Sequence, residues 1–366
     1  MTKRVLVLWA DEESSNLGVR VLGQGAAALA RRAWGPETVI DFQSFSYGPL
    51  QTQLSGKIVL KGLLTANRDL RRRMEKYDAV IDTGAGDSFT DIYGLKRLAI
   101  MFYTRFVAQK SSVPVILAPQ TIGPFETRVG RFLAKRTLRF AHSVMARDSV
   151  SMEFAKGLGP GADCLATDVI FALEQPPAPA SSTADVVLNV SGLLWSGDAH
   201  VSKDKYQSLT RELIEQLLAA GRSVTLMAHV LDNPSPDNDV AVIRKLAAEF
   251  PDRVTVFIPK DLEDVRRFIG GCSVVIGARM HACLNALSVG KPAIPLAYSR
   301  KFAPLLADIG WPHTLDLRSD EEIVRNVMAL LDGGQLSADA DSVRAKAEER
   351  LNAAVGHLTD QVGVRR

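Results

Sequence analysis

The stretch GCSVVIGARMHACLNALSVGKPAIPLAYSR, residues 271–300, decides the fold of this chain. A short β-branched run is typical of a buried strand, and a run of small and apolar residues that ends in glycine is typical of a helix. The pattern therefore predicts a strand, a turn, a helix and a second strand, at residues 273–276, 277–278, 281–289 and 292–296. Strand, helix and strand in this order form the repeating unit of a parallel sheet.

The turn in this stretch leads into two side chains that can carry positive charge, Arg279 and His281. Ligands of open parallel sheets bind beyond the carboxyl ends of the strands, where a helix N-terminus adds N–H groups and a partial positive charge. We therefore expect a site for a compact anion here. The alternative interpretation is structural: Arg279 caps a neighbouring element, and His281 packs in the core.

Composition narrows the class of protein. The chain has 366 residues, of which 46% are hydrophobic and 23% charged, as in a globular protein with two domains. The net charge of +3 argues against a nucleic-acid binder held by a basic face. The three cysteines lack zinc-site spacing, and the Asp-rich loop at 232–239 lacks the glycine and glutamate of a calcium loop, so we interpret that loop as solvated. We expect no metal and no cofactor.

The N-terminus carries no visible signal peptide, because residues 1–4 lead directly into a short apolar run at 5–9. No apolar run approaches the ~18 residues that a bilayer-spanning helix needs. We expect a cytoplasmic protein without a transmembrane segment, and a peripheral position at a membrane stays open.

Strands and helices alternate along both halves of the chain, which predicts two doubly wound parallel sheets. A run rich in proline, serine and threonine at 174–183 is the clearest linker. The predicted division is an N-terminal Rossmann-like domain at 1–175, a linker at 176–184, a C-terminal Rossmann-like domain at 185–335 and a C-terminal helix at 336–366 that packs back on the first domain. Two such domains facing a central cleft form the GT-B arrangement of the α/β class.

Several short motifs follow one another along both halves. They are Asn16-Leu17-Gly18, Gly84-Ala85-Gly86-Asp87, Pro119-Gln120-Thr121-Ile122-Gly123-Pro124, Ala146-Arg147-Asp148-Ser149, Thr167-Asp168, His229 and Ala278-Arg279-Met280-His281. In this order they resemble the polysaccharide pyruvyl transferase family, from about residue 5 to residue 306. Two departures lie in the first half: Val19 stands where the family often has aspartate, and Ala85 interrupts a run of glycines.

The resemblance implies an enzyme that moves pyruvate from phosphoenolpyruvate to two hydroxyls of a sugar in a glycan or glycoconjugate. The product is a cyclic ketal, and phosphate is released. The resemblance places Arg279 and His281 on the donor. We hypothesise that His281 is the general acid, because histidine is partly protonated near neutral pH, or that it holds the phosphate in its charged form. It makes Arg147 a second anion holder, and the alternative for Arg147 is an ion pair with Asp148 or a neighbouring carboxylate.

The remaining candidate residues also follow predicted strand ends. Asp87 is the first choice of general base, ahead of Asp11, Glu12 and Glu13, and its alternative is a solvated loop carboxylate. Substrate-binding roles are assigned to Gly84, Gly86, Gln120, Asn16, His229 and Lys301. The structural alternatives are a tight connection for the glycine turn, a strand-end cap for Gln120, a packed ring for His229 and surface exposure for Lys301.

Two other functions compete with this one. A GT-B glycosyltransferase or sugar epimerase would use a nucleotide sugar and usually holds the ribose with a carboxylate on the helix that here carries Asn285. A non-catalytic family member would act as a binding partner. The acceptor, whether polysaccharide, glycolipid or small natural product, the stereochemistry of the ketal and the formation of a homo-oligomer are left open.

Overall fold

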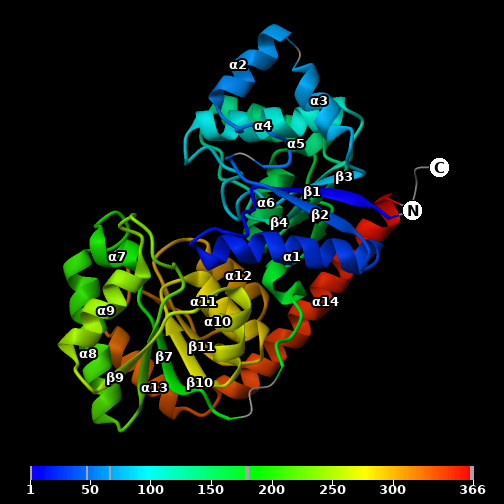
Figure 1. Ribbon diagram of the computed structural model, residues 1–366. Helices are drawn as coiled ribbons and strands as arrows, with labels where there is room; N and C mark the ends of the chain where they lie inside the picture. Colours follow the sequence, from blue (N-terminus) through cyan, green and yellow to red (C-terminus); the bar gives the residue numbers. More distant parts are fainter. Residues whose placement is uncertain (1, 47, 66, 178–180, 363–366) are drawn as a thin grey trace. The chain divides into compact units, whose positions relative to one another are not determined.

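The computed structural model describes residues 2–46, 48–65, 67–177 and 181–362. The chain forms two compact units (Figure 1). Unit 1 comprises Met1–Glu13, Leu22–Leu173 and Ala347–Arg366, and unit 2 comprises Ser14–Val21 and Glu174–Lys346. Within the described ranges, no helix is both long and apolar enough to cross a membrane.

Unit 1 is built on a six-stranded parallel sheet in the order β2-β1-β3-β4-β5-β6. The strands are β1 (Arg4–Leu8), β2 (Val39–Gln43), β3 (Ala79–Asp82), β4 (Val115–Gln120), β5 (Ser143–Ala146) and β6 (Cys164–Leu165). Every residue of β3, β4 and β5 is buried, because these strands are covered on both faces. β1 pairs with β2 on one side and with β3 on the other, so the strand order reverses between β1 and β3.

The helices of unit 1 connect these strands. They are α2 (Gly56–Thr65), α3 (Arg68–Met74), α4 (Leu95–Lys110), α5 (Arg128–Phe140), α6 (Ser149–Gly157) and the short 3₁₀ helix η1 (Val169–Ala172). Polar caps fix two of their starting points. Thr127 Oγ1 accepts from the N–H of Gly130 at the start of α5, and Asp148 accepts from the N–H of Ser151 at the start of α6.

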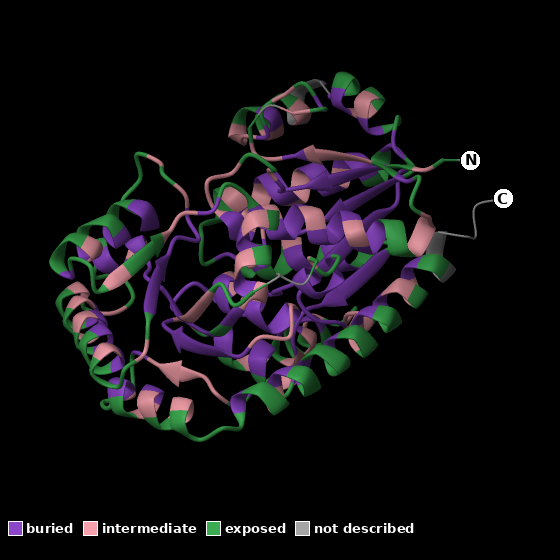
Figure 2. Cartoon of the chain, turned by 60° about the horizontal axis from the view of Figure 1, so that its bottom comes forward, coloured by how far each residue is buried: buried purple, intermediate pink, exposed green. Residues whose placement is uncertain are grey.

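Unit 2 repeats the plan with a six-stranded sheet in the order β12-β11-β10-β7-β8-β9. Its strands are β7 (Ala184–Asn189), β8 (Val224–Met227), β9 (Val254–Phe257), β10 (Cys272–Gly277), β11 (Ala293–Ala297) and β12 (Leu315–Asp316). β7 pairs in parallel with both β8 and β10, so here the order reverses between β7 and β10. β8 and β11 are wholly buried, the edge strands β9 and β12 are partly exposed, and the outward faces of the helices are exposed (Figure 2).

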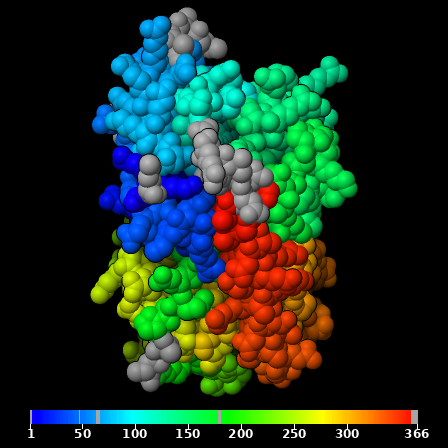
Figure 3. All heavy atoms as spheres, turned by 90° about the vertical axis from the view of Figure 1, so that its right-hand side faces the viewer, coloured from blue at the N-terminus to red at the C-terminus, as the bar shows by residue number. Residues whose placement is uncertain are grey.

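The helices that lie within unit 2 are α7 (Gly192–Ser196), α8 (Lys203–Ala219), α9 (Asp239–Glu249), α10 (Leu262–Gly270), α11 (Met280–Ser288), α12 (Phe302–Asp308) and α13 (Ile323–Asp332). Two longer helices contribute to both units: α1 (Leu17–Trp34) and the C-terminal α14 (Leu336–Val362), drawn in red at the surface in Figure 3. In unit 1, Glu348 of α14 forms an ion pair of 2.9 Å with Arg32 of α1.

The predicted class is confirmed: the chain is α/β, with two doubly wound parallel sheets of Rossmann type. The opening stretch forms β10, α11 and β11, each within one residue of its predicted bounds.

Candidate active site

Polar side chains gather at the carboxyl edge of the unit 2 sheet. β7 ends at Asn189, His229 follows the end of β8, and Arg279 follows the end of β10. The strands are parallel, so these three residues lie at one edge, and β7 and β10 flank the point where the strand order reverses. In open α/β sheets this is where ligands bind.

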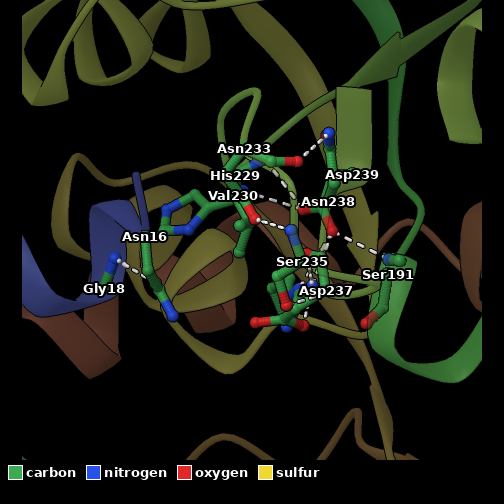
Figure 4. Close-up of polar contacts among 12 residues, drawn as sticks. Asn16, Gly18, Ser191, His229, Val230, Asn233, Ser235, Asp237, Asn238 and Asp239 are labelled. Atoms are coloured by element: carbon green, nitrogen blue, oxygen red, sulfur yellow. Dashed lines mark hydrogen bonds and ion pairs between the residues drawn. The ribbon is translucent and has the colours of Figure 1, made fainter. Parts of the chain in front are cut away.

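Asp239, the first residue of α9, joins the elements of this edge. Its carboxylate is fully buried. Oδ1 accepts from the N–H of Gly192 at 2.8 Å and from Nη2 of Arg279 at 2.7 Å, and Oδ2 accepts from the N–H groups of His229 and Val230 at 3.0 and 2.9 Å. Figure 4 labels Asp239 together with His229 and Val230. One side chain therefore fixes the loops after β7, β8 and β10 together.

Arg279 is bound to carboxylates on this edge. Its guanidinium donates to Asp239 and, through Nη2, to the Oδ1 and main-chain oxygen of Asp237 at 2.7 and 2.9 Å. Its own N–H donates to Oδ1 of Asn189 at 3.1 Å. Burial opposes the charge on Arg279, which is 8% exposed, but the Asp239 and Asp237 carboxylates outweigh it and raise its pKa. The guanidinium is therefore permanently charged and held in one orientation.

This geometry limits what Arg279 can offer an anion. Its Nε and Nη2 are already bonded to carboxylates. Among the described residues Nη1 of Arg279 has no hydrogen-bond acceptor, so a ligand would be bound through the N–H groups of this one nitrogen. The expectation for the Asp-rich loop at 232–239 is corrected: the loop is not simply solvated, because Asp239 is buried against Arg279.

His281 is the second residue of α11 and is half-buried. A Cβ added to Gly18 would lie 2.7 Å from Nδ1 of His281, so the imidazole packs directly on the first turn of α1. Asn16 does not keep its full side chain for a substrate, because its Oδ1 caps α1 by accepting from the N–H of Gly18 at 2.9 Å. Gly18 is thus required by the close approach of His281.

The start of α1 is attached to the loop after β8. The two segments share an isolated antiparallel bridge between Asn16 and Val230. Two backbone hydrogen bonds form it: Leu17 N–H to the His229 oxygen at 3.1 Å, and Leu231 N–H to the Ser15 oxygen at 2.7 Å. Asn16, Gly18, His229, Arg279 and His281 therefore lie together in unit 2. Asn16, Gly18 and His229 are labelled in Figure 4.

A buried chain of hydrogen bonds fixes the proton on His229. Arg266 donates to Oδ1 of Asn285 at 3.2 Å, to Oγ of Ser288 at 2.7 Å and to the main-chain oxygen of Glu174 at 3.2 Å. Because arginine only donates, the carboxamide of Asn285 must turn its Nδ2 toward Nε2 of His229, 2.9 Å away. Nε2 is then the acceptor, and the ring proton lies on Nδ1.

Burial and the neighbouring positive charge also favour the neutral form of His229. Burial, with the nearby His281 and Arg279, holds the pKa of His229 well below its ordinary 6.5. Burial also lowers the pKa of Arg266 to about 10, which still leaves that guanidinium charged at neutral pH. His229 is therefore a neutral imidazole that donates through Nδ1, and it cannot serve as a cationic anion holder near neutral pH.

Sequence reasoning missed Asp239, Arg266 and Asn285 as members of the site. One signal existed for Arg266: Leu262, Val265 and Ile269 mark the apolar face of α10, and Arg266 lies on it at helical spacing. A cation on an apolar face needs a buried partner. The pairing of Asp239 with Arg279 spans 40 positions of sequence and has no local signal.

In unit 1 the side chain of Arg147 is bound to other side chains. Its side chain is 1% exposed, Nη1 forms an ion pair of 3.0 Å with Asp168, and Nη2 donates to Oγ1 of Thr121 at 2.6 Å. The alternative of an ion pair with a neighbouring carboxylate is what the structure shows. Asp148 has another task, because it caps α6. This ion pair fixes the side chain of Arg147 within unit 1. A role for Arg147 as a second anion holder stays a prediction.

Gln120 and the glycine turn also pack within unit 1. Nε2 of the buried Gln120 donates to the main-chain oxygens of Asp82 and Ala118 at 2.9 and 3.3 Å. A Cβ on Gly84 would lie 1.8 Å from Oε1 of Gln120, and Gly84 has a φ of +59°. Gly84 thus makes room for Gln120, and substrate binding by this turn stays a prediction. A Cβ on Gly86 would meet Leu22 at 3.2 Å.

Two candidates stay at strand ends without a defined role. Asp87 follows β3 in unit 1, and its Oδ2 accepts from the hydroxyl of Tyr93 at 2.9 Å. Lys301 is half-buried in unit 2 and immediately precedes α12.

The two doubly wound sheets define a protein of GT-B architecture, with a polar carboxyl edge in unit 2. Solved structures agree on the fold. UDP-bound MnaA of S. aureus matches 100% of this chain and 98% of its own with a TM-score of 0.64 at 13% identity. UDP-GlcNAc 2-epimerase from Neisseria meningitidis, bound to UDP-GlcNAc, matches 98% of this chain and 100% of its own with a TM-score of 0.59 at 12% identity.

Sequence comparison gives the family. Residues 16–300 match the polysaccharide pyruvyl transferase family, so this chain belongs to it. The amylovoran biosynthesis protein AmsJ of Erwinia amylovora is 23% identical over 302 residues, which are 76% of this chain and 71% of that protein. The matched range runs from Asn16 to Arg300 and so contains Asn189, His229, Asp239, Arg279 and His281 of the unit 2 edge.

Proposed function

We propose that this chain transfers pyruvate from phosphoenolpyruvate to two hydroxyls of a sugar in polysaccharide biosynthesis, forming a cyclic ketal and releasing phosphate. Membership of the family supports pyruvyl transfer. The observation that supports a donor site is the position of Arg279-Met280-His281. These residues follow the carboxyl end of β10, beside the point where the strand order of the sheet reverses. A doubly anionic donor suits a cationic helix N-terminus.

The donor side would rely on His281 more than on Arg279. Two carboxylates already oppose the charge of Arg279, so its guanidinium alone offers a weak attraction to phosphate. The first turn of α11 adds N–H groups without intrahelical partners. His281 lies in this turn and belongs to the residue type best suited to give a proton near neutral pH; its side chain is half-buried, with Nε2 enclosed by protein. Neutral His229 would orient the donor through Nδ1.

The chemistry balances with these groups. A proton from His281 adds to the methylene carbon of phosphoenolpyruvate and makes C2 electrophilic, and an acceptor hydroxyl then attacks C2. The bond from C2 to the phosphate oxygen breaks, a second hydroxyl closes the ketal, and the two hydroxyl protons leave on a base and on phosphate. Asp87 stays the proposed base. Positive charge near the leaving phosphate lowers the barrier.

The test is phosphate release from phosphoenolpyruvate with a panel of acceptor glycans. We expect release that depends on an acceptor, and a fall of at least about 100-fold in kcat for His281→Ala, the size typical of a general acid. His142→Ala is the matched control, because His142 precedes β5 at the amino edge of the unit 1 sheet. Thermal stabilisation by UDP or UDP-sugars in place of phosphoenolpyruvate would overturn the proposal in favour of a nucleotide-sugar enzyme.

A further inference from the structure

Exposed apolar side chains are concentrated in one part of unit 1. Of the ten large hydrophobic residues exposed in the described part of the chain, seven lie around the starts of α4, α5 and α6. They are Ile92, Tyr93, Leu95, Val129, Phe132, Val150 and Phe154. Phe132 is 62% exposed and Val129 is 53% exposed. Contiguous exposed apolar groups of this kind mark an interaction surface.

The residues form a connected surface. Asp91 accepts from the N–H groups of Glu126 and Thr127, which ties the turn bearing Ile92 and Tyr93 to the start of α5. A hollow of about 560 Å³ beside α6 is lined mainly by that helix, with Phe154 and Glu153 among its residues, and Arg131 is the residue that α5 adds. We call the exposed faces of α5 and α6, with residues 92–95, the α5–α6 surface.

The charge of α5 complements an anionic partner. The helix carries five basic residues and no acidic one, and all five are exposed: Arg128, Arg131, Lys135, Arg136 and Arg139. Phe132 lies four residues from both Arg128 and Arg136, so the two arginines flank the ring on the solvent face of the helix. The opposite face, with Ala134 and Leu138, is buried in the core.

We propose that the α5–α6 surface docks unit 1 onto an anionic lipid bilayer. Basic residues interleaved with exposed rings are the pattern of a helix lying in the membrane interface, where rings enter the acyl boundary and long cationic side chains reach the headgroups. A protein partner fits less well, because charged residues are depleted at the core of protein interfaces. The inference is independent of the reaction proposed above.

The experiment is co-sedimentation of the full chain with vesicles of phosphatidylcholine alone or mixed with phosphatidylglycerol at about 3:1. We expect binding to the anionic vesicles only, and a marked loss of binding at high salt. Each basic residue near an anionic surface contributes about fivefold to partitioning, so Arg136→Glu with Arg139→Glu lowers it by at least about 25-fold. Val129→Ser with Phe132→Ser also lowers partitioning onto the vesicles, because these apolar side chains no longer insert into the bilayer.

Matched controls lie in unit 2. Arg244→Glu with Lys245→Glu reverses two exposed charges on α9, and Val256→Ser replaces an exposed apolar residue on β9. Both controls keep wild-type binding. The proposal is overturned if wild-type protein does not sediment with anionic vesicles, or if the α5 variants bind as well as the controls. It is equally overturned if sedimentation velocity shows self-association that Phe132→Ser abolishes, because the surface would then bind a second copy.

Discussion

Asn285 Nδ2 lies 2.9 Å from Nε2 of His229, while Oδ1 of the same carboxamide accepts from Arg266. The buried arginine thus dictates which ring nitrogen of His229 carries the proton, and it does so through Asn285. We predict that Asn285→Asp moves the proton to Nε2, because a carboxylate can only accept there. Long-range ¹H–¹⁵N NMR of the imidazole reports the tautomer directly. A spectrum unchanged by the substitution would show that Arg266 and Asn285 do not control His229.

The same ring makes stability depend on pH. The folded protein holds the pKa of His229 well below 6.5, so below about pH 6.5 the unfolded state binds more protons at this position. Its stabilising contribution is therefore complete above that pH and is lost as the pH falls. We predict that His229→Gln flattens the fall in unfolding free energy between about pH 6.5 and pH 5, by up to about 1.4 kcal/mol per pH unit.

Urea unfolding across this pH range provides the measurement. The exposed His200 serves as a matched control, since His200→Gln removes a histidine without changing the buried edge. Equal slopes for wild type and His229→Gln would contradict a buried neutral imidazole.

Asp239 is predicted to be the most sensitive carboxylate of unit 2. Its side chain is fully buried and paired with Arg279, which is itself almost completely buried. Asp239→Ala leaves that cation short of a partner and breaks three loop contacts, so we expect a loss of about 3–5 kcal/mol in unfolding free energy. Asp237→Ala is the comparison, because Asp237 binds the same guanidinium but its side chain is 33% exposed. A loss for Asp239→Ala no greater than for Asp237→Ala would refute this ranking.

Gly18 allows a test of the position of His281. Alanine at position 18 would place Cβ 2.7 Å from Nδ1 of His281 and 3.1 Å from Oδ1 of Asn16, so the imidazole must move. Because misplacement by about 1 Å can lower catalysis by about 100-fold, we expect Gly18→Ala to lower kcat far more than stability. Gly356→Ala in α14 is the control, since no atom lies within 4 Å of its added Cβ. Wild-type kcat in Gly18→Ala would remove His281 from the proposed mechanism.

The sequence predicted the sheets and the position of the turn because both depend on local patterns. β-branched runs end in small residues at the strand ends, and the strand–turn–helix at residues 272–288 follows from them. Partners of buried charges could not be predicted, because they depend on strand order. Arg147 pairs with Asp168, which is 21 positions away in the sequence, and Arg279 pairs with Asp239, which is 40 positions away. An arginine at a strand end therefore looks the same in sequence whether it binds a ligand or a buried carboxylate.

The turn after β3 offers a test in which two neighbouring positions respond oppositely. Ala85 has a φ of +47°, a left-handed conformation that costs a residue with a Cβ roughly 1–2 kcal/mol. Ala85→Gly relieves this strain but adds freedom to the unfolded chain, which offsets about 0.4–1 kcal/mol. We predict that Ala85→Gly raises the unfolding free energy by up to about 1 kcal/mol.

Gly84→Ala adds the same strain and a Cβ 1.8 Å from Oε1 of Gln120, so it destabilises unit 1 by several kcal/mol. Urea unfolding of both variants decides the matter: if Ala85→Gly destabilises, the left-handed alanine is not a source of strain, and the turn is held by contacts of its methyl group instead.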